Sequence, residues 1–175
     1  MSESAGTLDN HPDQSLANLA GKYLTFQLGD EIYSIEILKV QEIIGIMSIT
    51  AVPKTPEYVR GVINLRGKVI PVVELRRKFS MKTQEDTERT CIIVVQVSGS
   101  DGPITMGILV DEVSEVVDIM ESQIEPAPTF GAAVDTNFIL AMGKVGDRVV
   151  ILLDVDRVLT VGEMDLLSRN SGDQA

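Results

Sequence analysis

Residues 59–75 read Val59-Arg60-Gly61-Val62-Ile63-Asn64-Leu65-Arg66-Gly67-Lys68-Val69-Ile70-Pro71-Val72-Val73-Glu74-Leu75, and this stretch decides the fold. Two runs rich in Val and Ile lie on either side of a short turn, a pattern that predicts a β-hairpin. The turn is expected at Leu65-Arg66, between Asn64 and Gly67, because glycine adopts a positive φ without strain. Pro71 has no N–H to donate, so the second strand is expected at a sheet edge or at a bulge.

The predicted turn holds the Arg66 guanidinium out in solvent on a stiff support. Arginine is enriched among the residues that dominate protein interfaces, although most surface arginines bind nothing. A protein-binding residue and an idle, solvated side chain therefore both fit Arg66 on these grounds.

The sequence contains an internal repeat. Val40-Gln41-Glu42-Ile43 in the first half matches Val113-Ser114-Glu115-Val116 in the second. Residues 68–75 match residues 148–155, and these two segments lie further apart in the chain than the first pair does. The second half therefore carries about seven extra residues, which we expect in the loop near 129–136.

Each half contains about five short apolar runs separated by turn residues. This pattern predicts an all-β fold of two packed five-stranded barrels, with a β-sandwich as the main alternative. Residues 37–44 fit either a short helix or an irregular strand. The expected divisions are a disordered leader at 1–21, a first barrel at about 22–80, a second barrel at about 88–160, and a C-terminal helix and tail at 161–175.

Composition excludes several classes of function. The net charge is −11, with 26 acidic and 15 basic residues, which opposes binding to nucleic acid or to an anionic membrane surface. No apolar run approaches the ~20 residues of a membrane-spanning helix. The one cysteine, Cys91, cannot form an intrachain disulfide, and the start of the chain lacks the pattern of a signal peptide. We therefore expect a cytoplasmic location.

The sequence offers little to build an active site. The only histidine, His11, lies in the polar leader, so neither the usual zinc sites nor a Ser-His-Asp triad is expected. Residues 61–69 resemble a phosphate-binding loop, but five residues separate the glycines and Val69 replaces the required Ser or Thr. The carboxylate pairs Asp111/Glu112 and Asp154/Asp156 are expected on solvated faces or turns. We predict a protein that is not an enzyme and binds no cofactor or metal.

Six motifs spread along the chain are informative when taken together. They are Phe26-Gln27-Leu28-Gly29-Asp30-Glu31, Leu38-Lys39-Val40-Gln41-Glu42-Ile43, Arg60-Gly61-Val62-Ile63-Asn64-Leu65-Arg66-Gly67, Ile70-Pro71-Val72-Val73-Glu74-Leu75-Arg76, Val110-Asp111-Glu112-Val113-Ser114-Glu115-Val116 and Glu125-Pro126-Ala127-Pro128. This set resembles the CheW family of bacterial chemotaxis coupling proteins. The resemblance covers about Gly21 to Leu167. It implies two five-stranded SH3-like β-barrels that exchange strands, within a CheW-like domain at 22–160.

The resemblance also implies partners and contact residues. The family couples methyl-accepting chemoreceptors, through their cytoplasmic tip, to the regulatory domain of a CheA-type histidine kinase, so recruitment to membrane-associated receptor arrays is expected. Asn64, Arg66 and Gly67 correspond to one contact region, and Val40, Glu42 and Ile43 to a second. Gly61 supports the kinase-facing strand region. Val113 and Val116 match positions that line the receptor-binding groove, although a core role fits both valines equally well.

Two other functions stay open on the sequence. One is a CheW-like scaffold in a parallel chemosensory pathway that controls surface motility or gene expression. The other is a small-ligand β-barrel binder or an unrecognised enzyme. The leader and Met47-Ser48 depart from the family pattern, which bears on the choice of partner.

Overall fold

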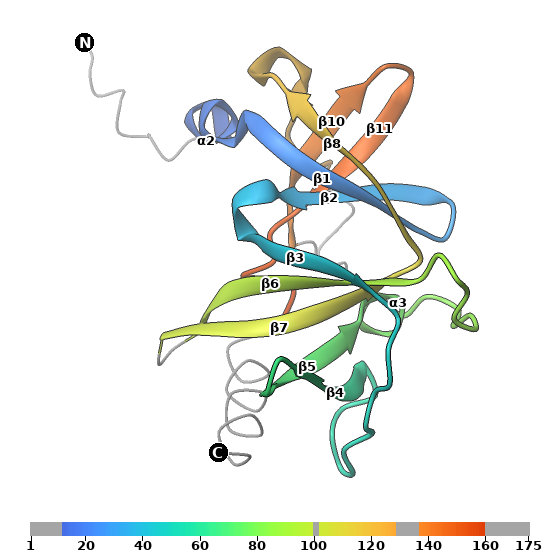
Figure 1. The fold of residues 1–175 in the computed structure, drawn as a ribbon. Helices are drawn as coiled ribbons and strands as arrows, with labels where there is room; N and C mark the ends of the chain where they lie inside the picture. The colour runs from blue at the N-terminus through green and yellow to red at the C-terminus, as the bar shows by residue number, and fades with distance from the viewer. Residues whose placement is uncertain (1–11, 100–101, 129–136, 160–175) are drawn as a thin grey trace.

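The computed structural model describes residues 12–99, 102–128 and 137–159, and these residues form mostly β-strands (Figure 1). Among them, no helix is long and apolar enough to cross a membrane. The helical elements are α2 (Pro12–Leu19), η1 (Ile37–Lys39), α3 (Leu75–Lys78) and η2 (Glu121–Gln123). The strands are β1 (Gly21–Leu28), β2 (Glu31–Glu36), β3 (Val40–Gly45), β4 (Val59–Leu65), β5 (Lys68–Glu74), β6 (Cys91–Gly99), β7 (Gly102–Val110), β8 (Glu112–Ile119), β9 (Ile124–Glu125), β10 (Ile139–Val145) and β11 (Arg148–Leu153).

The described strands form two sheets, which lie one above the other in Figure 1. Sheet A has the order β8-β1-β2-β11-β10-β9, and sheet B has the order β3-β6-β7-β5-β4. The all-β, two-part fold predicted from the sequence is confirmed. Sheet A has one strand more than expected, because the short strand β9 pairs with β10.

The two halves of the chain exchange hairpins. The β1–β2 hairpin comes from the first half but pairs with β8 and β11 of the second half. The β6–β7 hairpin comes from the second half but pairs with β3 and β5 of the first. The predicted exchange is therefore confirmed, but barrels at 22–80 and 88–160 are not what forms, because each sheet draws on both halves.

The short connections between the sheets explain this exchange. Because β1 is antiparallel to both β2 and β8, β8 runs parallel to β2. If the first half of the chain closed on itself, β3 would pair with β1 in the place of β8 and would run parallel to β2. The connection from the end of β2 to the start of β3 would then have to span the whole length of β2, about 20 Å. Only Ile37–Lys39 separates β2 from β3, and this connection reaches at most about 14 Å. The connection from β7 to β8 is Asp111 alone.

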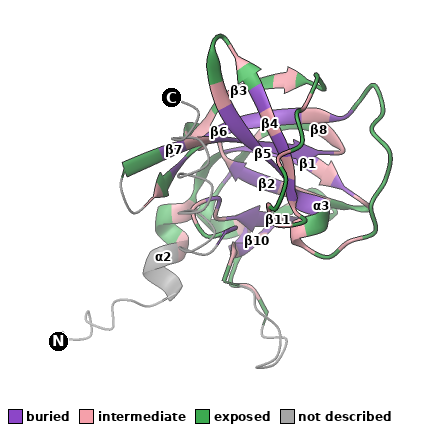
Figure 2. Ribbon diagram, turned by 90° about the horizontal axis from the view of Figure 1, so that it is seen from below, coloured by how far each residue is buried: buried purple, intermediate pink, exposed green. Residues whose placement is uncertain are grey.

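Three apolar clusters hold the molecule together, and Figure 2 shows the buried segments along the centres of the strands. One cluster lies within sheet A, one within sheet B and one between the sheets. The cluster of sheet A contains Tyr23, Ile119, Ile124, Ala141, Val150 and Leu152. The cluster of sheet B contains Ile63, Ile70, Val72, Ile92, Val94 and Leu109. The cluster between them includes Leu24, Phe26, Leu28, Ile35, Val73, Ile93, Val95, Met106, Ile108 and Leu153. Each sheet thus curls around its own interior, as a barrel does.

The central hairpin forms with the predicted strands but with a different turn. Leu65 pairs with Lys68, so Arg66-Gly67 is the centre of the turn, one residue later than expected. β5 lies between β4 and β7, so it is not an edge strand. Pro71 is tolerated because the pairing of β5 with β7 begins only at Val72.

Two segments of ambiguous sequence are now resolved, and others lie outside the described residues. Residues 37–44, which fitted either a short helix or an irregular strand, contain one of each: a 3₁₀ turn is followed directly by strand β3. The leader is more ordered than expected, because α2 occupies Pro12–Leu19 and its Leu16 and Leu19 pack against the cluster of sheet A. The predicted loop insertion at 129–136 and the C-terminal helix and tail at 161–175 fall outside the described residues.

Candidate functional site

Arg66 and Glu42 form a bidentate ion pair. Arg66 Nη1 lies 2.6 Å from Glu42 Oε1, and Arg66 Nη2 lies 2.8 Å from Glu42 Oε2. Hydrogen bonds from the guanidinium lower the pKa of the Glu42 carboxyl. The sequence placed these residues in two separate contact regions, with Arg66 free in solvent. The structure joins them, although 71% of the Arg66 side chain stays exposed.

The ion pair spans the place where sheet B curls upon itself. Glu42 lies on β3 and Arg66 lies at the β4–β5 turn, at opposite ends of the strand order of the sheet. The φ angles of Arg66 and Gly67 are +54° and +85°, as in a type I′ turn, whose twist matches that of the flanking strands. The Gly67 N–H donates a hydrogen bond of 2.8 Å to Asn64 Oδ1. Asn64 and Gly67 therefore shape the tip that carries Arg66.

Apolar side chains extend this surface along β3 and beyond it. Ile43 is 43% exposed, and Ile46 and Met47 are each 37% exposed. Glu42, Ile43, Ile46, Met47 and Arg66 together are called the β3 face. Ile46 was not predicted as a contact residue, and Met47 was noted only as part of a departure from the family pattern that bears on the choice of partner. Val40 and Ile43 lie on the same side of β3, because they pair with Val95 and Ile93 of the cluster between the sheets, and Val40 is half-buried against that cluster. Glu42 pairs with Val94 of the cluster of sheet B and therefore lies on the other side of the strand.

Gly61 is a buried support for the β3 face and not a part of its surface. Thr50 and Val62 exchange two backbone hydrogen bonds of 2.9 Å, which hold the segment after β3 against β4. A Cβ on Gly61 would collide with the Thr50 carbonyl, and the φ of Gly61 is +148°. Only glycine allows the two backbones to approach this closely.

Val113 and Val116 lie on β8, the edge strand of sheet A, and occupy the positions equivalent to Val40 and Ile43 on β3. Val113 is half-buried against the cluster between the sheets, as Val40 is. Val116 is 47% exposed, close to the exposure of Ile43. The structure therefore places the predicted contact residues on two faces, one on each sheet. The second is called the β8 face and comprises Val113, Glu115 and Val116.

Asp111 and Asp156, which were expected on solvated faces or turns, do lie in a bend and a turn, and each is also an ion-pair partner. Asp111 pairs with Arg76, and Asp156 pairs with Lys39 at 2.8 Å. Within the described residues, no three His, Cys, Asp or Glu side chains are grouped to hold a metal ion.

Comparison with known proteins agrees with this geometry. Residues 22–163 match the CheW-like domain family. Chemotaxis protein CheW of Klebsiella aerogenes is 39% identical over 158 residues, which cover 87% of this chain and 93% of the relative. Chemotaxis protein CheW of Helicobacter pylori is 36% identical, covering 79% of this chain and 81% of the relative.

A solved structure has the same fold. The crystal structure of the scaffolding protein TtCheW from Thermoanaerobacter tengcongensis superposes with a TM-score of 0.73 at 34% sequence identity. The match covers 83% of this chain and 98% of that protein. On the family match, the sequence relatives and the shared fold, the chain belongs to the CheW-like domain family, a family of chemotaxis proteins.

Proposed function

We propose that this protein is a non-enzymatic adaptor that couples chemoreceptors to a CheA-type histidine kinase. The observation that carries the proposal is the β3 face, where an ion pair and exposed apolar side chains lie along the edge strand of a sheet and the segment that follows it. Membership of the CheW-like family gives this face its meaning, because the relatives are chemotaxis proteins and a structural neighbour is a scaffolding protein.

The β3 face has the anatomy of a protein-docking site. Edge strands offer unpaired backbone groups, and arginine and large apolar side chains dominate binding energies. Arg66 is held at a fixed place by the turn and by Glu42, so a partner binds it without a large loss of side-chain entropy. We assign the kinase regulatory domain to this face, with Asn64, Gly67 and Gly61 holding it in shape.

The receptor tip is assigned to the β8 face. Val116 offers an exposed apolar contact, and Val113 lies beneath it next to the core between the sheets. The two faces belong to different sheets, and the proposal is that the chain holds one partner on each. An adaptor transmits the state of the receptor only if its contacts differ between the active and inactive assemblies. The protein is expected to be cytoplasmic and to be recruited to receptor arrays through these contacts.

The test is a reconstitution with a soluble receptor signalling fragment and the kinase, preceded by a pulldown from native cell lysate with the purified chain as bait. Recovery of both partners, and receptor control of kinase autophosphorylation only when the chain is present, is the expected result. Recovery of receptors and a kinase of a different chemosensory pathway would assign the chain to that pathway. A folded bait that binds neither receptor nor kinase would contradict the proposal.

A further inference from the structure

The β3 and β8 faces are built alike. The backbone register repeats, since Ile43 pairs with Ile93 of β6 as Val116 pairs with Leu24 of β1. Both pairings have a register shift at the equivalent place. It lies between Val40 and Glu42 of β3 and between Val113 and Val116 of β8. Glu115 on β8 therefore stands where Glu42 stands on β3.

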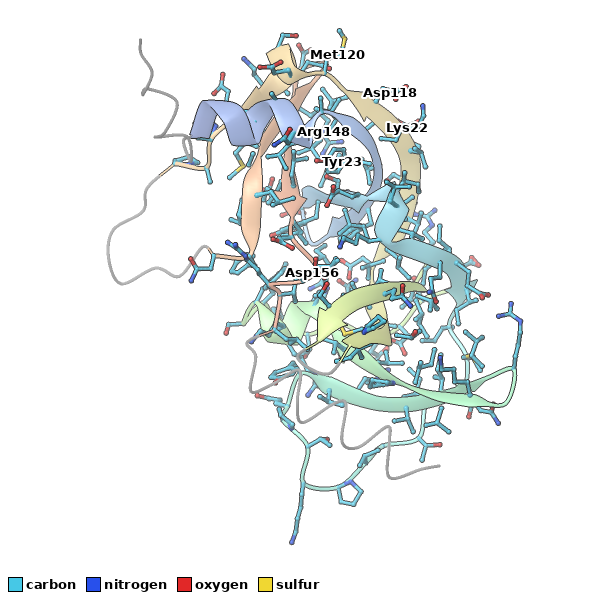
Figure 3. All side chains as sticks on the ribbon, turned by 90° about the vertical axis from the view of Figure 1, so that its left-hand side faces the viewer. Lys22, Tyr23, Asp118, Met120, Arg148 and Asp156 are labelled. Carbon is cyan, nitrogen blue, oxygen red and sulfur yellow. The ribbon has the colours of Figure 1, made fainter. Side chains whose placement is uncertain are left out.

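The Thr25 side chain holds the backbone of Glu115 in place. The Thr25 hydroxyl donates a hydrogen bond of 2.7 Å to the Glu115 carbonyl oxygen and accepts one of 3.1 Å from the Glu115 N–H. Within the described residues, the Glu115 carboxylate has neither an ion pair nor a side-chain hydrogen bond. Lys22 of the neighbouring strand β1 is already engaged with Asp118 at 2.9 Å, and Lys144 of β10 is engaged with Glu125 at 2.7 Å. Figure 3 shows Lys22 and Asp118 close together on β1 and β8.

In sheet B the β4–β5 turn carries the Arg66 side chain. The equivalent β10–β11 turn of sheet A has a glycine at that position and offers no side chain. Because residues 68–75 match residues 148–155, Gly146 in the β10–β11 turn occupies the position of the repeat that is equivalent to Arg66. Both residues have a positive φ, +62° for Gly146 and +54° for Arg66, although the next residue has a positive φ only in the Arg66-Gly67 turn. A Cβ built on Gly146 meets no atom within 4 Å. The turn of sheet A therefore has room for a Cβ at the position where sheet B carries Arg66.

We propose that the β8 face takes an arginine side chain from its partner, which binds Glu115 in the place that Arg66 takes beside Glu42. This inference rests on the proposed function, which assigns the receptor tip to the β8 face, and it names the chemistry of that contact. The occupant is a segment of the receptor tip that carries an arginine beside an apolar residue. The arginine pairs with Glu115, and the apolar residue covers Val116.

An arginine fits this position better than a lysine or a purely apolar residue. The Glu42–Arg66 pair shows that this strand-and-turn frame accommodates a planar guanidinium with both carboxylate oxygens engaged. A net charge of −11 favours the approach of a basic side chain. An apolar partner alone would leave Glu115 desolvated without a hydrogen bond, which is unfavourable.

The decisive variant is Gly146→Arg, which supplies the guanidinium from within the chain. A Cβ at this position meets no atom, and Arg66 shows that a non-glycine residue tolerates a positive φ at the equivalent turn position, so the variant is expected to fold with a modest loss of stability. We expect it to weaken binding of a soluble receptor signalling fragment by about tenfold and to reduce the salt dependence of that binding. Gly146→Gln is the matched control, since it imposes the same backbone requirement and a long side chain without the charge, and it should bind nearly as the wild type does.

A second variant tests the same contact from the other side. Glu115→Gln removes the charge without changing the backbone, and it should weaken receptor binding by a similar factor whether or not Gly146→Arg folds. In both variants, binding of the isolated kinase regulatory domain should stay within about twofold of the wild type.

The possible results separate this inference from the proposed function. If the wild type binds the receptor fragment but Gly146→Arg and Glu115→Gln bind it equally well, the inference is wrong and the proposed function stands. Equal losses in Gly146→Arg and Gly146→Gln, or losses confined to the kinase domain, would also overturn it. If the wild type binds neither partner, both the proposed function and the inference fail.

Discussion

Arg76 and Asp111 form a two-point ion pair at the place where the chain passes from sheet B into sheet A. Arg76 Nε lies 2.7 Å from Asp111 Oδ1, and Arg76 Nη2 lies 2.5 Å from Asp111 Oδ2. The Gly29 N–H, in the β1–β2 turn, donates a further hydrogen bond of 2.8 Å to Asp111 Oδ2. One carboxylate therefore joins α3 of the first half, the β7–β8 connection and a turn of sheet A.

The connection between β2 and β3 also carries an ion pair, but here the basic residue lies in the connection and the acidic residue lies in the other half of the chain. Lys39, just before β3, pairs with Asp156, which also accepts a hydrogen bond of 2.8 Å from the Ser98 N–H. Asp156 directly follows the repeat segment 148–155 as Arg76 directly follows 68–75, so the two residues are equivalent. Figure 3 shows Asp156 between the upper and lower sheets. Each of the edge strands β3 and β8 therefore begins directly after a residue held by an ion pair, Lys39 for β3 and Asp111 for β8.

Removing the Arg76 charge should destabilise the whole molecule. In Arg76→Gln, the partly buried Asp111 carboxylate loses its counter-ion, and we expect a loss of about 2–3 kcal/mol in the free energy of unfolding. Urea denaturation followed by circular dichroism measures it. Arg89→Gln is the control, because Arg89 is exposed and lies 3.8 Å from Glu112, so its effect should stay within about 0.5 kcal/mol. Equal effects of the two substitutions would contradict a structural role for the Arg76–Asp111 pair.

Gly61→Ala should be strongly destabilising, because its Cβ would collide with the Thr50 carbonyl and its φ of +148° disfavours any side chain. We expect a loss of about 2–4 kcal/mol. Gly146→Ala is the matched control, with a positive φ but open space, and should cost only about 1 kcal/mol. Thermal or urea unfolding distinguishes the two. A loss for Gly61→Ala no larger than that of the control would mean that the Thr50 segment yields without difficulty.

Reversing the charge of Arg66 should affect binding more than folding. Arg66→Glu places two carboxylates together on an exposed surface, and it should weaken association with the kinase domain by at least about 1–2 kcal/mol. Isothermal titration calorimetry measures the affinity, and circular dichroism confirms the fold. In the double variant Arg66→Glu/Glu42→Arg the ion pair forms again, so repulsion within the protein is removed. If binding stays weak in the double variant, the partner recognises the arginine itself. An unfolded single variant, or unchanged affinity for both kinase and receptor, would exclude Arg66 as a contact residue.

High pH should weaken the fold through Tyr23. Burial, reinforced by the nearby Glu36 carboxylate, raises the pKa of Tyr23 from 10.0 to about 12, and its hydroxyl donates a hydrogen bond of 2.6 Å to the Leu19 carbonyl. The unfolded chain therefore loses this proton before the folded chain does. The stabilisation is fully present below pH 10 and is lost as the pH rises toward about 12.

Tyr23→Phe isolates this effect. The variant should lose the part of the pH dependence between about 10 and 12 that belongs to Tyr23, and it should also lose the hydrogen bond to α2. Urea unfolding at a series of pH values, with absorbance titration of tyrosine ionisation, provides the measurement. An identical pH dependence in wild type and variant would show that Tyr23 ionises alike in the folded and unfolded chains.

The sequence alone determined the strands, the repeat and the family, because these depend on local patterns. Alternating Val and Ile fix which face of a strand is buried, and the hairpin at 59–75 carries its own turn residues. The sequence also indicated Arg66 and Glu42 as functional, but as separate contacts. The distance between two residues so far apart in the chain depends on how sheet B curls, and no local pattern encodes that curvature.

Only the tertiary structure decided which strands share a sheet and which charges meet. The exchange of hairpins follows from connections too short to return along a strand, a constraint that appears only when strand directions are known. The same exchange brings Asp111 to Arg76 and Asp156 to Lys39, although nothing in the sequence singled out these pairs. It also gives Glu115 and Gly146 the places that Glu42 and Arg66 hold in the other sheet, because the two docking faces are equivalent only once both sheets have closed around their interiors.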